Sequence, residues 1–583
     1  MYKRAFAVLT VPAVLFAVSF GCSKGGSGFT EDDGGEGGIG DEGGIIPPFG
    51  GDGGEASTTS PHCSADLHQI LDQNNQVVMT CPPDQGCGQG GCVPACQSAE
   101  ENKSTVGCDY YAVEPDTINV AQGGCFAAFV ANTWGVPVKL TADYNGQQIN
   151  MANAARIPQG SGQSITYSAL PNGELPPNQV AIIFLARNAS IACPNGVTPG
   201  IATDGAAHGT AMGHAFHITS SAPVVAYDIY PFGGSLSFAS SATLLLPSTA
   251  WGTNYVGVAP YEKDQVVSYA QPSLAIAARE ATDVTINPTA AIVGGGGVAA
   301  TGKNVPHTYH LNKGDVLQFT QDAQLTGSPI QSTKPVGVWA VATCLNIDVN
   351  DTACDAAHQQ IPPVLALGHE FVAVRYRNRA QSEESVPWRI VGGVPGTTLK
   401  YFPSAPQGAP LSVNQGTLAQ FWSPGPFVVQ SQDDQHPFYM SGHMTGQDHA
   451  PASGTGDPEF VNVIPSAEFL ASYVFFTDPT YANTNLVLVR KDSGQGYQDV
   501  TLDCLGKVSG WQPINGTAYQ YARVDITVNG QAQGMCNNGR HQITSNAPFG
   551  LTVWGWDQYV SYAYPAGASV QPINTVIVPA TPN

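Results

Sequence analysis

The feature that most constrains the fold of this chain is an internal repeat. A Ser, a short spacer, a Pro and an apolar run recur four times, with the prolines 112, 102 and 111 residues apart. The copies read SSAPVVAY (220–227), STKPVGVW (332–339), SQDDQHPFY (431–439) and SNAPFGLT (545–552). A Pro is tolerated at the start of a strand because its missing N–H is needed only inside the ladder. The repeat predicts four β-units of roughly 100 residues, with Val225, Val338 and Leu551 buried in their strands.

A second signature follows the first three copies and sets the expected boundaries. It is a Pro followed eight residues later by an aromatic residue and a Val. The pairs are Pro247 with Tyr255-Val256, Pro363 with Phe371-Val372, and Pro465 with Tyr473-Val474. We therefore expect a β-repeat region over 109–570, with approximate units 109–246, 247–362, 363–464 and 465–570, and a C-terminal tail at 571–583.

The pattern of residues between the two repeated signatures predicts an all-β fold. Short runs rich in Val, Ile, Thr, Tyr and Phe, such as QVAIIFLA (179–186) and NLVLVRK (485–491), alternate with Gly, Pro, Asn and Asp, which is typical of strands and turns. Only 11% of residues are charged, and 66 Gly and 44 Pro are present. This composition argues against coiled coils and helical bundles. We expect tandem β-sandwich or β-repeat units, preceded by a small disulfide-rich module.

The N-terminus predicts export and lipid anchoring. Lys3 and Arg4 precede an apolar run that ends at Gly21-Cys22. This run is too short and too early for an ordinary spanning helix. A small residue followed by Cys resembles the cleavage site of bacterial lipoproteins, with 1–21 as signal peptide and Cys22 lipidated; a plain secretory signal with an incidental Cys is the alternative. Residues 22–62 then read as the anchor and a Gly-rich acidic linker, and the protein is placed at the cell surface or outer membrane.

The cysteine count supports a disulfide framework. Thirteen cysteines become twelve once Cys22 is lipidated, and an even number suits an exported, disulfide-bonded chain. Six of them lie in 63–108, where fifteen pairings are possible, and three pairs are expected in the rest: Cys125–Cys193, Cys344–Cys354 and Cys504–Cys536. Zinc at Cys87, Cys92 and Cys96 is the competing interpretation, but no C-x-x-C pair occurs, and we expect no metal site. The disulfide candidates are Cys63, Cys81, Cys87, Cys92, Cys96, Cys108, Cys125, Cys193, Cys344, Cys354, Cys504 and Cys536.

Charge and motifs exclude several functions. The chain carries 22 basic and 44 acidic side chains, a formal net charge of −22, which argues against nucleic acid as a partner. No G-x-S-x-G elbow, H-E-x-x-H helix or phosphate-binding loop is present. We therefore expect neither catalysis nor a cofactor.

Two groups of residues are candidates for binding a partner. Arg375, Arg377 and Arg379 alternate, so on a strand their guanidinium groups would share one face and suit an anionic glycan or a carboxylate; a solvated outer face is the alternative. Trp554 and Trp556 would likewise share a face and form a stacking platform for a sugar, with core packing as the alternative.

The stretch 215–256 resembles the N-terminal domain family of IgGFc-binding protein. The matching features are Ser220 to Tyr227, the Leu244–Pro247 run, and Gly252 to Val256. The ending VSYAYPAG (560–567) is also similar. The resemblance implies an extracellular recognition or adhesion module, and it transfers no site residue.

Three functions remain open from sequence. The first is a surface-anchored lipoprotein that acts as a binding or adhesion module for an extracellular protein or glycan and touches the membrane only through its lipid. The second is a structural component that assembles with copies of itself. The third is a divergent enzyme acting on extracellular polymers.

Overall fold

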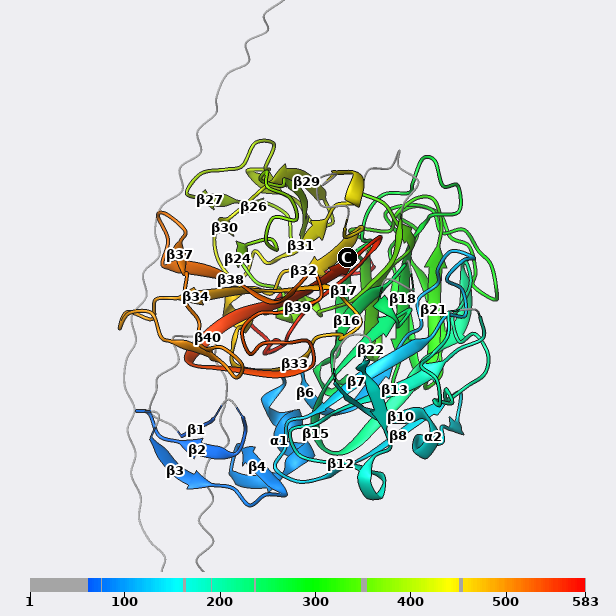
Figure 1. The fold of residues 1–583 in the computed structure, drawn as a ribbon. Coiled ribbons are helices and arrows are strands. Elements are labelled where there is room, and N and C mark those ends of the chain that lie inside the picture. The colour runs from blue at the N-terminus through cyan, green and yellow to red at the C-terminus, as the bar shows by residue number, and fades with distance from the viewer. Residues whose placement is uncertain are drawn as a thin grey trace, which may run out of the picture. The chain divides into compact units, whose positions relative to one another are not determined.

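Strands dominate the chain, and the expected all-β fold is confirmed (Figure 1). The structure, a computed structural model, describes residues 61–64, 66–74, 76–160, 164–189, 191–234, 237, 239–347, 354–449 and 455–581. The signal peptide, Cys22 and nearly all of the linker lie outside these residues. Helical segments are short: α1 (Ala95–Asn102), α2 (Met151–Ala154), η2 (Pro171–Gly173), η4 (Ser248–Ala250), η5 (Val364–Ala366), η6 (Gln447–His449) and η7 (Ser466–Glu468). Within the described residues, no helix has the length and apolar character needed to cross a membrane.

A cysteine-rich module begins the described chain. Its elements are a sheet of β1 (His62–Cys63), β2 (Gln69–Leu71) and β3 (Val77–Thr80), a hairpin of β4 (Gln85–Gly88) and β5 (Gly91–Pro94), and helix α1. Its disulfides are Cys63–Cys87, Cys81–Cys92 and Cys96–Cys108. Cys108 lies on a strand of the first large sheet, so the last of these bonds joins the module to that sheet.

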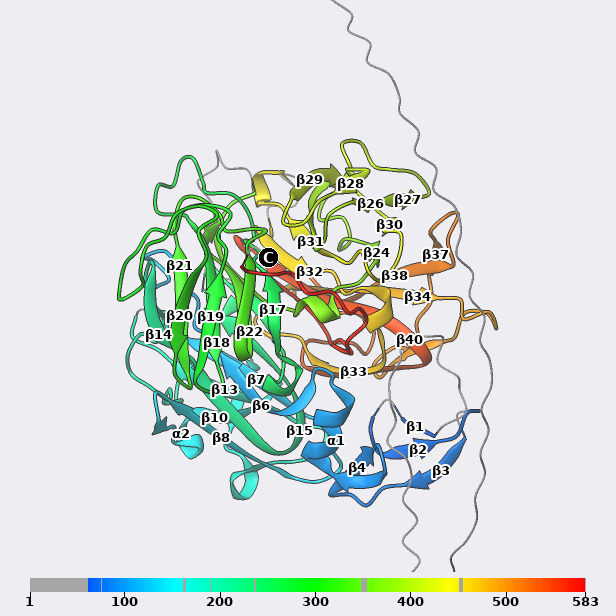
Figure 2. The same ribbon diagram turned by 180° about the vertical axis from the view of Figure 1, so that it is seen from behind.

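Two large antiparallel sheets follow. The first contains β6 (Val106–Ala112), β7 (Phe126–Asn132), β8 (Val138–Tyr144), β9 (Gln147–Gln148), β10 (Ala155–Gln159), β11 (Thr166–Ser168), β12 (Glu174–Leu175), β13 (Val180–Ala186), β15 (Phe216–Tyr230) and β16 (Ser241–Leu245). The second contains β14 (Ala211–His214), β17 (Gly252–Val256), β18 (Pro272–Ala278), β19 (Thr282–Ile286), β20 (His307–Leu311), β21 (Asp315–Thr320), β22 (Pro329–Leu345) and β23 (Asp355–Ile361). Figure 2 shows β18 to β22 running side by side.

The C-terminal half forms further sheets. One is β24 (Glu370–Ala373), β30 (Phe427–Gln430) and β27 (Lys400–Phe402); another is β29 (Leu418–Ser423), β25 (Val386–Gly392), β31 (Phe438–Met444) and β32 (Glu459–Asn462), beside the pair β26 (Thr397–Thr398) and β28 (Ser412–Val413). The last contains β33 (Leu470–Phe476), β34 (Asn483–Lys491), β35 (Val500–Leu502), β36 (Gly506–Lys507), β37 (Gln512–Pro513), β38 (Tyr519–Val528), β39 (Gln531–Ala532), β40 (Arg540–Asp557) and β41 (Val560–Pro565).

The repeated Ser and Pro mark a bulge. In three copies the Pro lies inside a long strand, β15, β22 or β40, and not at its start as expected from sequence. At this point the register shifts, because an advance of five residues along the Pro strand is matched by an advance of only two along its partner strand. The paired steps are Thr219–Val224 with Asp109–Gly107, Gln331–Val336 with Asn254–Gly252, and Thr544–Phe549 with Ser472–Leu470. The missing N–H of Pro is harmless in a bulge, where the ladder is already interrupted.

In the first three copies the repeated Ser bonds the backbone of the residue before Pro. The hydroxyl groups of Ser220 and Ser332 donate to the carbonyl oxygen of the residue before Pro, at 2.8 and 2.6 Å. Ser431 does the same across its longer spacer, at 2.6 Å. Val225, Val338 and Leu551, beyond the bulge, are buried, as predicted.

The repeated aromatic residue joins the two signatures within each copy. Tyr255 donates its hydroxyl to the carbonyl of Val336, directly after Pro335, at 2.6 Å, and accepts from the N–H of Gly252. Tyr473 bonds the carbonyl of Phe549 in the same way. Tyr110 supplies the first copy, which sequence reasoning missed, by donating to Val224 at 2.6 Å. The third copy has Phe371 here, whose ring is tilted against that of Phe438 with 4.6 Å between the centroids.

Small residues link one copy to the next. A Cβ built on Gly107 would lie 2.4 Å from Cβ of Pro247, and one on Gly252 would lie 2.5 Å from Cβ of Pro363. Gly368 stands in the same relation to Pro465, at 2.2 Å. Only glycine permits these approaches, so the Pro that opens the second signature packs against the previous copy.

The strand that follows each Pro strand contributes to an inner ring. β16, β23, β32 and β41 each pair with a Pro strand, and they also contact one another in the cycle β16–β23–β32–β41–β16. Side chains bridge these strand edges: the hydroxyls of Ser241 and Thr243 accept from the N–H groups of His358 and Gln360, at 3.1 and 2.9 Å. We call β16, β23, β32 and β41 the inner ring.

The segment after β41 packs along the copies. Ile573 donates its N–H to Leu365 at 2.8 Å, and Asn574 donates to the carbonyls of Val364 and Leu367. Val578 is held by the side chain of Asn254. The described part of the expected tail, 571–581, therefore contacts the β-repeat region.

Three disulfides lie beyond the module in the described residues. They are Cys125–Cys193, Cys344–Cys354 and Cys504–Cys536. These are the three pairs that the sequence analysis expected, and each closes a loop within one sheet region.

Candidate functional site

The three candidate arginines lie on a loop. β24 ends at Ala373, so the expectation of alternating residues on one strand face is wrong. Arg375 and Arg379 are buried, at 2% and 8% exposure, and Arg377 is half-buried. They do not form a solvated face, because the loop packs against β34, β38 and β40.

Each guanidinium has its own partners. Arg379 forms an ion pair with Glu384 at 2.5 Å, and Arg377 forms one with Asp525 at 2.7 Å. Arg375 instead donates to the carbonyl of Tyr376 at 2.9 Å and to the side chain of Asn378. The arrangement holds the loop in place and presents no row of free guanidinium groups.

The two candidate tryptophans are core residues. Trp554 and Trp556 are 2% and 1% exposed, so an exposed sugar platform at this position is wrong. Tyr376 of the same loop packs 4.9 Å from the Trp554 ring, and Arg377 lies over the Trp556 ring at 4.8 Å. The structure thus brings the predicted arginines and tryptophans together, in the interior.

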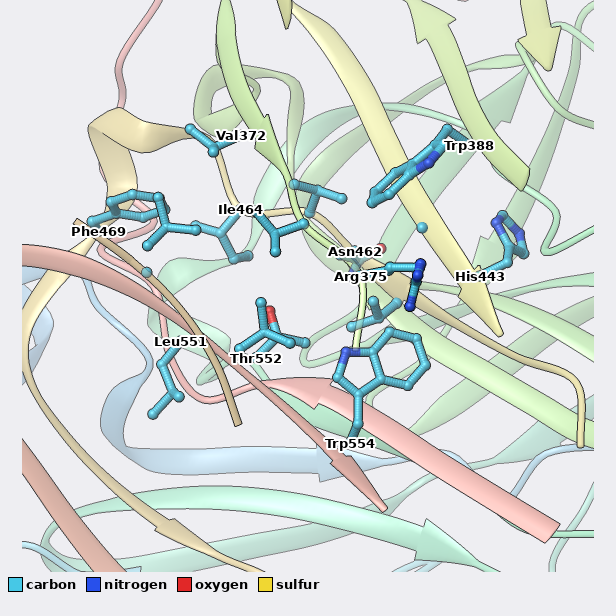
Figure 3. Close-up of a pocket in the computed structure, with 17 residues that line it drawn as sticks. Val372, Arg375, Trp388, His443, Asn462, Ile464, Phe469, Leu551, Thr552 and Trp554 are labelled. Carbon is cyan, nitrogen blue, oxygen red and sulfur yellow. The ribbon is translucent and has the colours of Figure 1, made fainter. Parts of the chain in front are cut away.

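A cavity lies beside this group (Figure 3). Arg375, Trp554, His443 and Asn462 line it together with aliphatic side chains such as Leu551. Its volume of about 40 Å³ is far below the roughly 300 Å³ that small-molecule sites need. The cavity can hold one or a few water molecules or ions of similar size, but it is too small for a sugar.

The inner ring encloses a cluster of buried polar side chains that the sequence analysis missed. The members of this polar hub are Asp228, Asp355, His358, Gln359 and Glu459, each fully buried. His358 Nε2 lies 2.5 Å from Asp228 Oδ1. The Gln359 amide donates to the carbonyls of Ala242 on β16 and Ala563 on β41, at 2.7 and 3.0 Å.

The hub bonds the inner strands to one another. Glu459 accepts from the Ser241 hydroxyl at 3.2 Å, and Asp355 accepts from the N–H of Ser561 at 3.3 Å. Inner strand edges have N–H and C=O groups that must find partners when buried. Burial raises the pKa of Asp355 and of Glu459 well above their ordinary values. The hub is a structural network. Its polar residues in the buried strand DAAHQQI (355–361) were the available sequence signal.

Histidine–carboxylate clusters lie nearer the surface of the first sheet. His208 bonds Asp116 at 2.8 Å and Asp204 at 3.1 Å, and these hydrogen bonds raise the pKa of His208 to about 10. His217 lies between Asp109 and Asp143, at 2.8 and 3.1 Å. In both clusters the imidazole nitrogens are occupied by carboxylates, which fixes the rings and leaves no nitrogen to act on a substrate.

The described residues bring possible metal ligands together at Asp503, Cys504 and His541. Cys504 is bonded to Cys536, so it offers no thiolate to a metal. His541 Nδ1 lies 3.0 Å from Asp503 Oδ1, which gives both groups a partner without an ion.

Comparison with known proteins assigns the family. The family model described as IgGFc binding protein matches residues 241–555, which is more than half of the chain. The chain belongs to the IgGFc-binding protein family. The match runs from the first residue of β16 into β40, so it includes three of the four Pro strands and the loop that carries Arg375.

Individual relatives are distant. Human IgGFc-binding protein is 24% identical over 357 residues, which cover 58% of this chain and 6% of the human protein. The match thus spans a small fraction of that relative. Among solved structures, an anti-sigma factor domain-containing protein from Clostridium clariflavum aligns with 8% identity over 74% of this chain and 98% of its own, with a TM-score of 0.10, which carries no argument about the fold.

Proposed function

We propose that this protein is an exported, surface-anchored lipoprotein that binds an extracellular protein or glycan and performs no catalysis. The observation that carries the proposal is membership of a binding-protein family over residues 241–555. The six disulfides of the described residues support an oxidising, extracellular setting.

Because these candidate residues are interior, the binding surface is expected on the outer loops and on the edges of the sheets. The described cavity beside Trp554 is too small for a sugar, and Arg379 and Trp556 are buried. Recognition residues on a rigid β scaffold commonly lie on its connecting segments. Trp422 on β29 is 39% exposed and is a better candidate for stacking on a ligand than Trp554.

A glycan and protein array probed with the mature, disulfide-bonded protein tests the binding role. Specific capture by one glycan or protein class, reduced in Trp422→Ala and retained in the buried-core control Val338→Ala, is the expected result. An array without specific capture, together with turnover in a polysaccharide hydrolase screen, would overturn the proposal.

Anchoring is tested separately through Cys22. The Cys22→Ala variant is expected in the soluble exported fraction, whereas the neighbouring Ser23→Ala variant stays with the membrane. If Cys22→Ala still fractionates with membranes, the lipoprotein assignment is wrong and binding is unaffected.

Self-assembly is a second candidate, favoured by one observation. β3 pairs with β2 alone among the described strands, and its Val77, Val78 and Met79 are each more than half exposed. An exposed, uncharged edge strand can add a strand from a second copy. Size-exclusion chromatography at rising concentration would show association that Val78→Lys removes and Val266→Lys, an exposed residue elsewhere, does not.

A further inference from the structure

Arg375 is a buried cation without a carboxylate of its own. Its neighbours Arg377 and Arg379 pair with Asp525 and Glu384, whereas no ion pair involves Arg375 in the described residues. Arg523 adds a further guanidinium nearby, since its Nε donates to the Arg375 carbonyl at 2.9 Å. Glu384 interacts with Arg375 only through the electrostatic field, and among the described residues no carboxylate lies within ion-pair distance of Arg375.

Two buried N–H groups of this region, one of them on Arg375 itself, have no acceptor. The Nε of Arg375 and the Nε1 of Trp554 are buried, and no atom of the described chain accepts from either. Both side chains line the same cavity (Figure 3). A buried donor without an acceptor is costly, and a buried charge without a partner more so.

The other residues that line the cavity limit which kind of molecule or ion could occupy it. Aliphatic and aromatic side chains, among them Val461, Val487 and Leu551, form most of the wall. His443 is the other titratable group there, and burial lowers its pKa to about 3, so the ring is uncharged at neutral pH. The cavity therefore offers two unpartnered donors and one positive charge, with the Thr552 hydroxyl also in its wall, in a volume of about 40 Å³.

We propose that the cavity beside Arg375 and Trp554 binds a small monovalent anion of halide size. Such an ion accepts from both N–H groups and neutralises the guanidinium. A water molecule also accepts from both, but it leaves the charge uncompensated and brings two hydrogens that need acceptors. The anion would join the 374–382 loop to β40 and would stabilise the folded chain by mass action.

The test compares thermal stability in sodium bromide and in sodium gluconate at equal ionic strength, because gluconate is too large for the cavity. For the wild-type protein the melting temperature is expected to rise by roughly 1–2 °C for each tenfold rise in bromide above its dissociation constant. Arg375→Gln and Trp554→Phe each remove this dependence. The matched controls Arg490→Gln and Trp511→Phe, at a half-buried Arg–Trp pair elsewhere, retain it.

Anomalous diffraction from crystals soaked in bromide locates the ion and covers variants that fail to fold. A bromide peak in contact with Arg375 and Trp554 supports the proposal. No peak there, no difference between bromide and gluconate, or the same salt dependence in all variants would each overturn it and assign the cavity to water.

Discussion

The cysteine-rich module and the β-repeat region are stabilised by different means. The module has three disulfides over 63–108, and its interior contains few apolar side chains, among them Leu67, Ala95 and Ala99. The β-repeat region buries aromatic and aliphatic side chains throughout, together with the polar hub. A short segment cannot bury enough apolar surface to fix its fold, so covalent bonds take the place of a core.

The two regions contact each other at a tryptophan, in addition to the Cys96–Cys108 bond and the packing of α1 against β6 and β15. Trp134, which follows β7, donates its Nε1–H to the carbonyl of Pro83 at 2.8 Å, and its ring lies 4.3 Å from that of His68. A Cβ on Gly86 would approach the same ring to 3.0 Å. A module stabilised by disulfides is therefore seated on a scaffold stabilised by its core. The following substitutions test this difference between the two regions.

Trp556→Ala is expected to have the largest effect. The side chain is 1% exposed and packs with Tyr376 and Arg377. Removing a buried Trp costs about 3–5 kcal/mol, and chemical denaturation should show it, while peptide mapping finds the module disulfides intact. Trp511→Ala, at a half-buried Trp, is the control; an equal loss there would contradict the core assignment.

The double substitution Cys63→Ser, Cys87→Ser is expected to destabilise the module by about 3 kcal/mol, because the bond closes a loop of 24 residues. Hydrogen exchange should rise in 62–94 and stay unchanged in β15 and β22. If the melting temperature of the β-repeat region falls as well, the module belongs to the same cooperative unit and the comparison breaks down.

Glu468 predicts a pH dependence confined to the β-repeat region. Burial raises its pKa from 4.5 to about 7. The folded chain therefore holds this proton to a higher pH than the unfolded chain, so its contribution is fully present below pH 4.5 and is lost as the pH rises through 7. Across this window the loss is about 2–3 kcal/mol.

Glu468→Gln should flatten the fall in unfolding free energy between pH 5 and pH 7, measured by denaturant titration. Asp478, whose pKa burial raises to about 6, leaves a residual slope of the same sign. A variant with an unchanged slope would show that Glu468 is ionised in the folded chain.

Tyr255→Phe tests the hydrogen bond that joins the two repeat signatures. Loss of the hydroxyl removes a bond to Val336 and leaves its buried carbonyl without that donor, which costs about 1–2 kcal/mol. Tyr269→Phe, at an exposed Tyr, is the control and should be neutral. An unchanged stability for Tyr255→Phe would mean that the Phe371 arrangement of the third copy suffices in every copy.

The sequence by itself determined the repeated strand and the disulfide pairs of the β-repeat region. The repeat depends on short-range information, because in three copies a Ser bonds the carbonyl of the residue before Pro within the same short segment. Cys344 and Cys354 are likewise only ten residues apart. The alternation of apolar runs and turn residues likewise determined the all-β class, because strand formation follows from side-chain pattern.

Only the tertiary structure decided which polar and aromatic residues face solvent. The sequence pattern predicted an exposed row at Arg375 and Arg379 and an exposed platform at Trp554 and Trp556. Packing of β34, β38 and β40 against the 374–382 loop buries all four side chains instead. The polar hub arises in the same way, from inner strands contributed by four distant segments. Burial depends on contacts between residues far apart in the chain, such as Gln359 with Ala563, and the local pattern of either residue contains no record of the other.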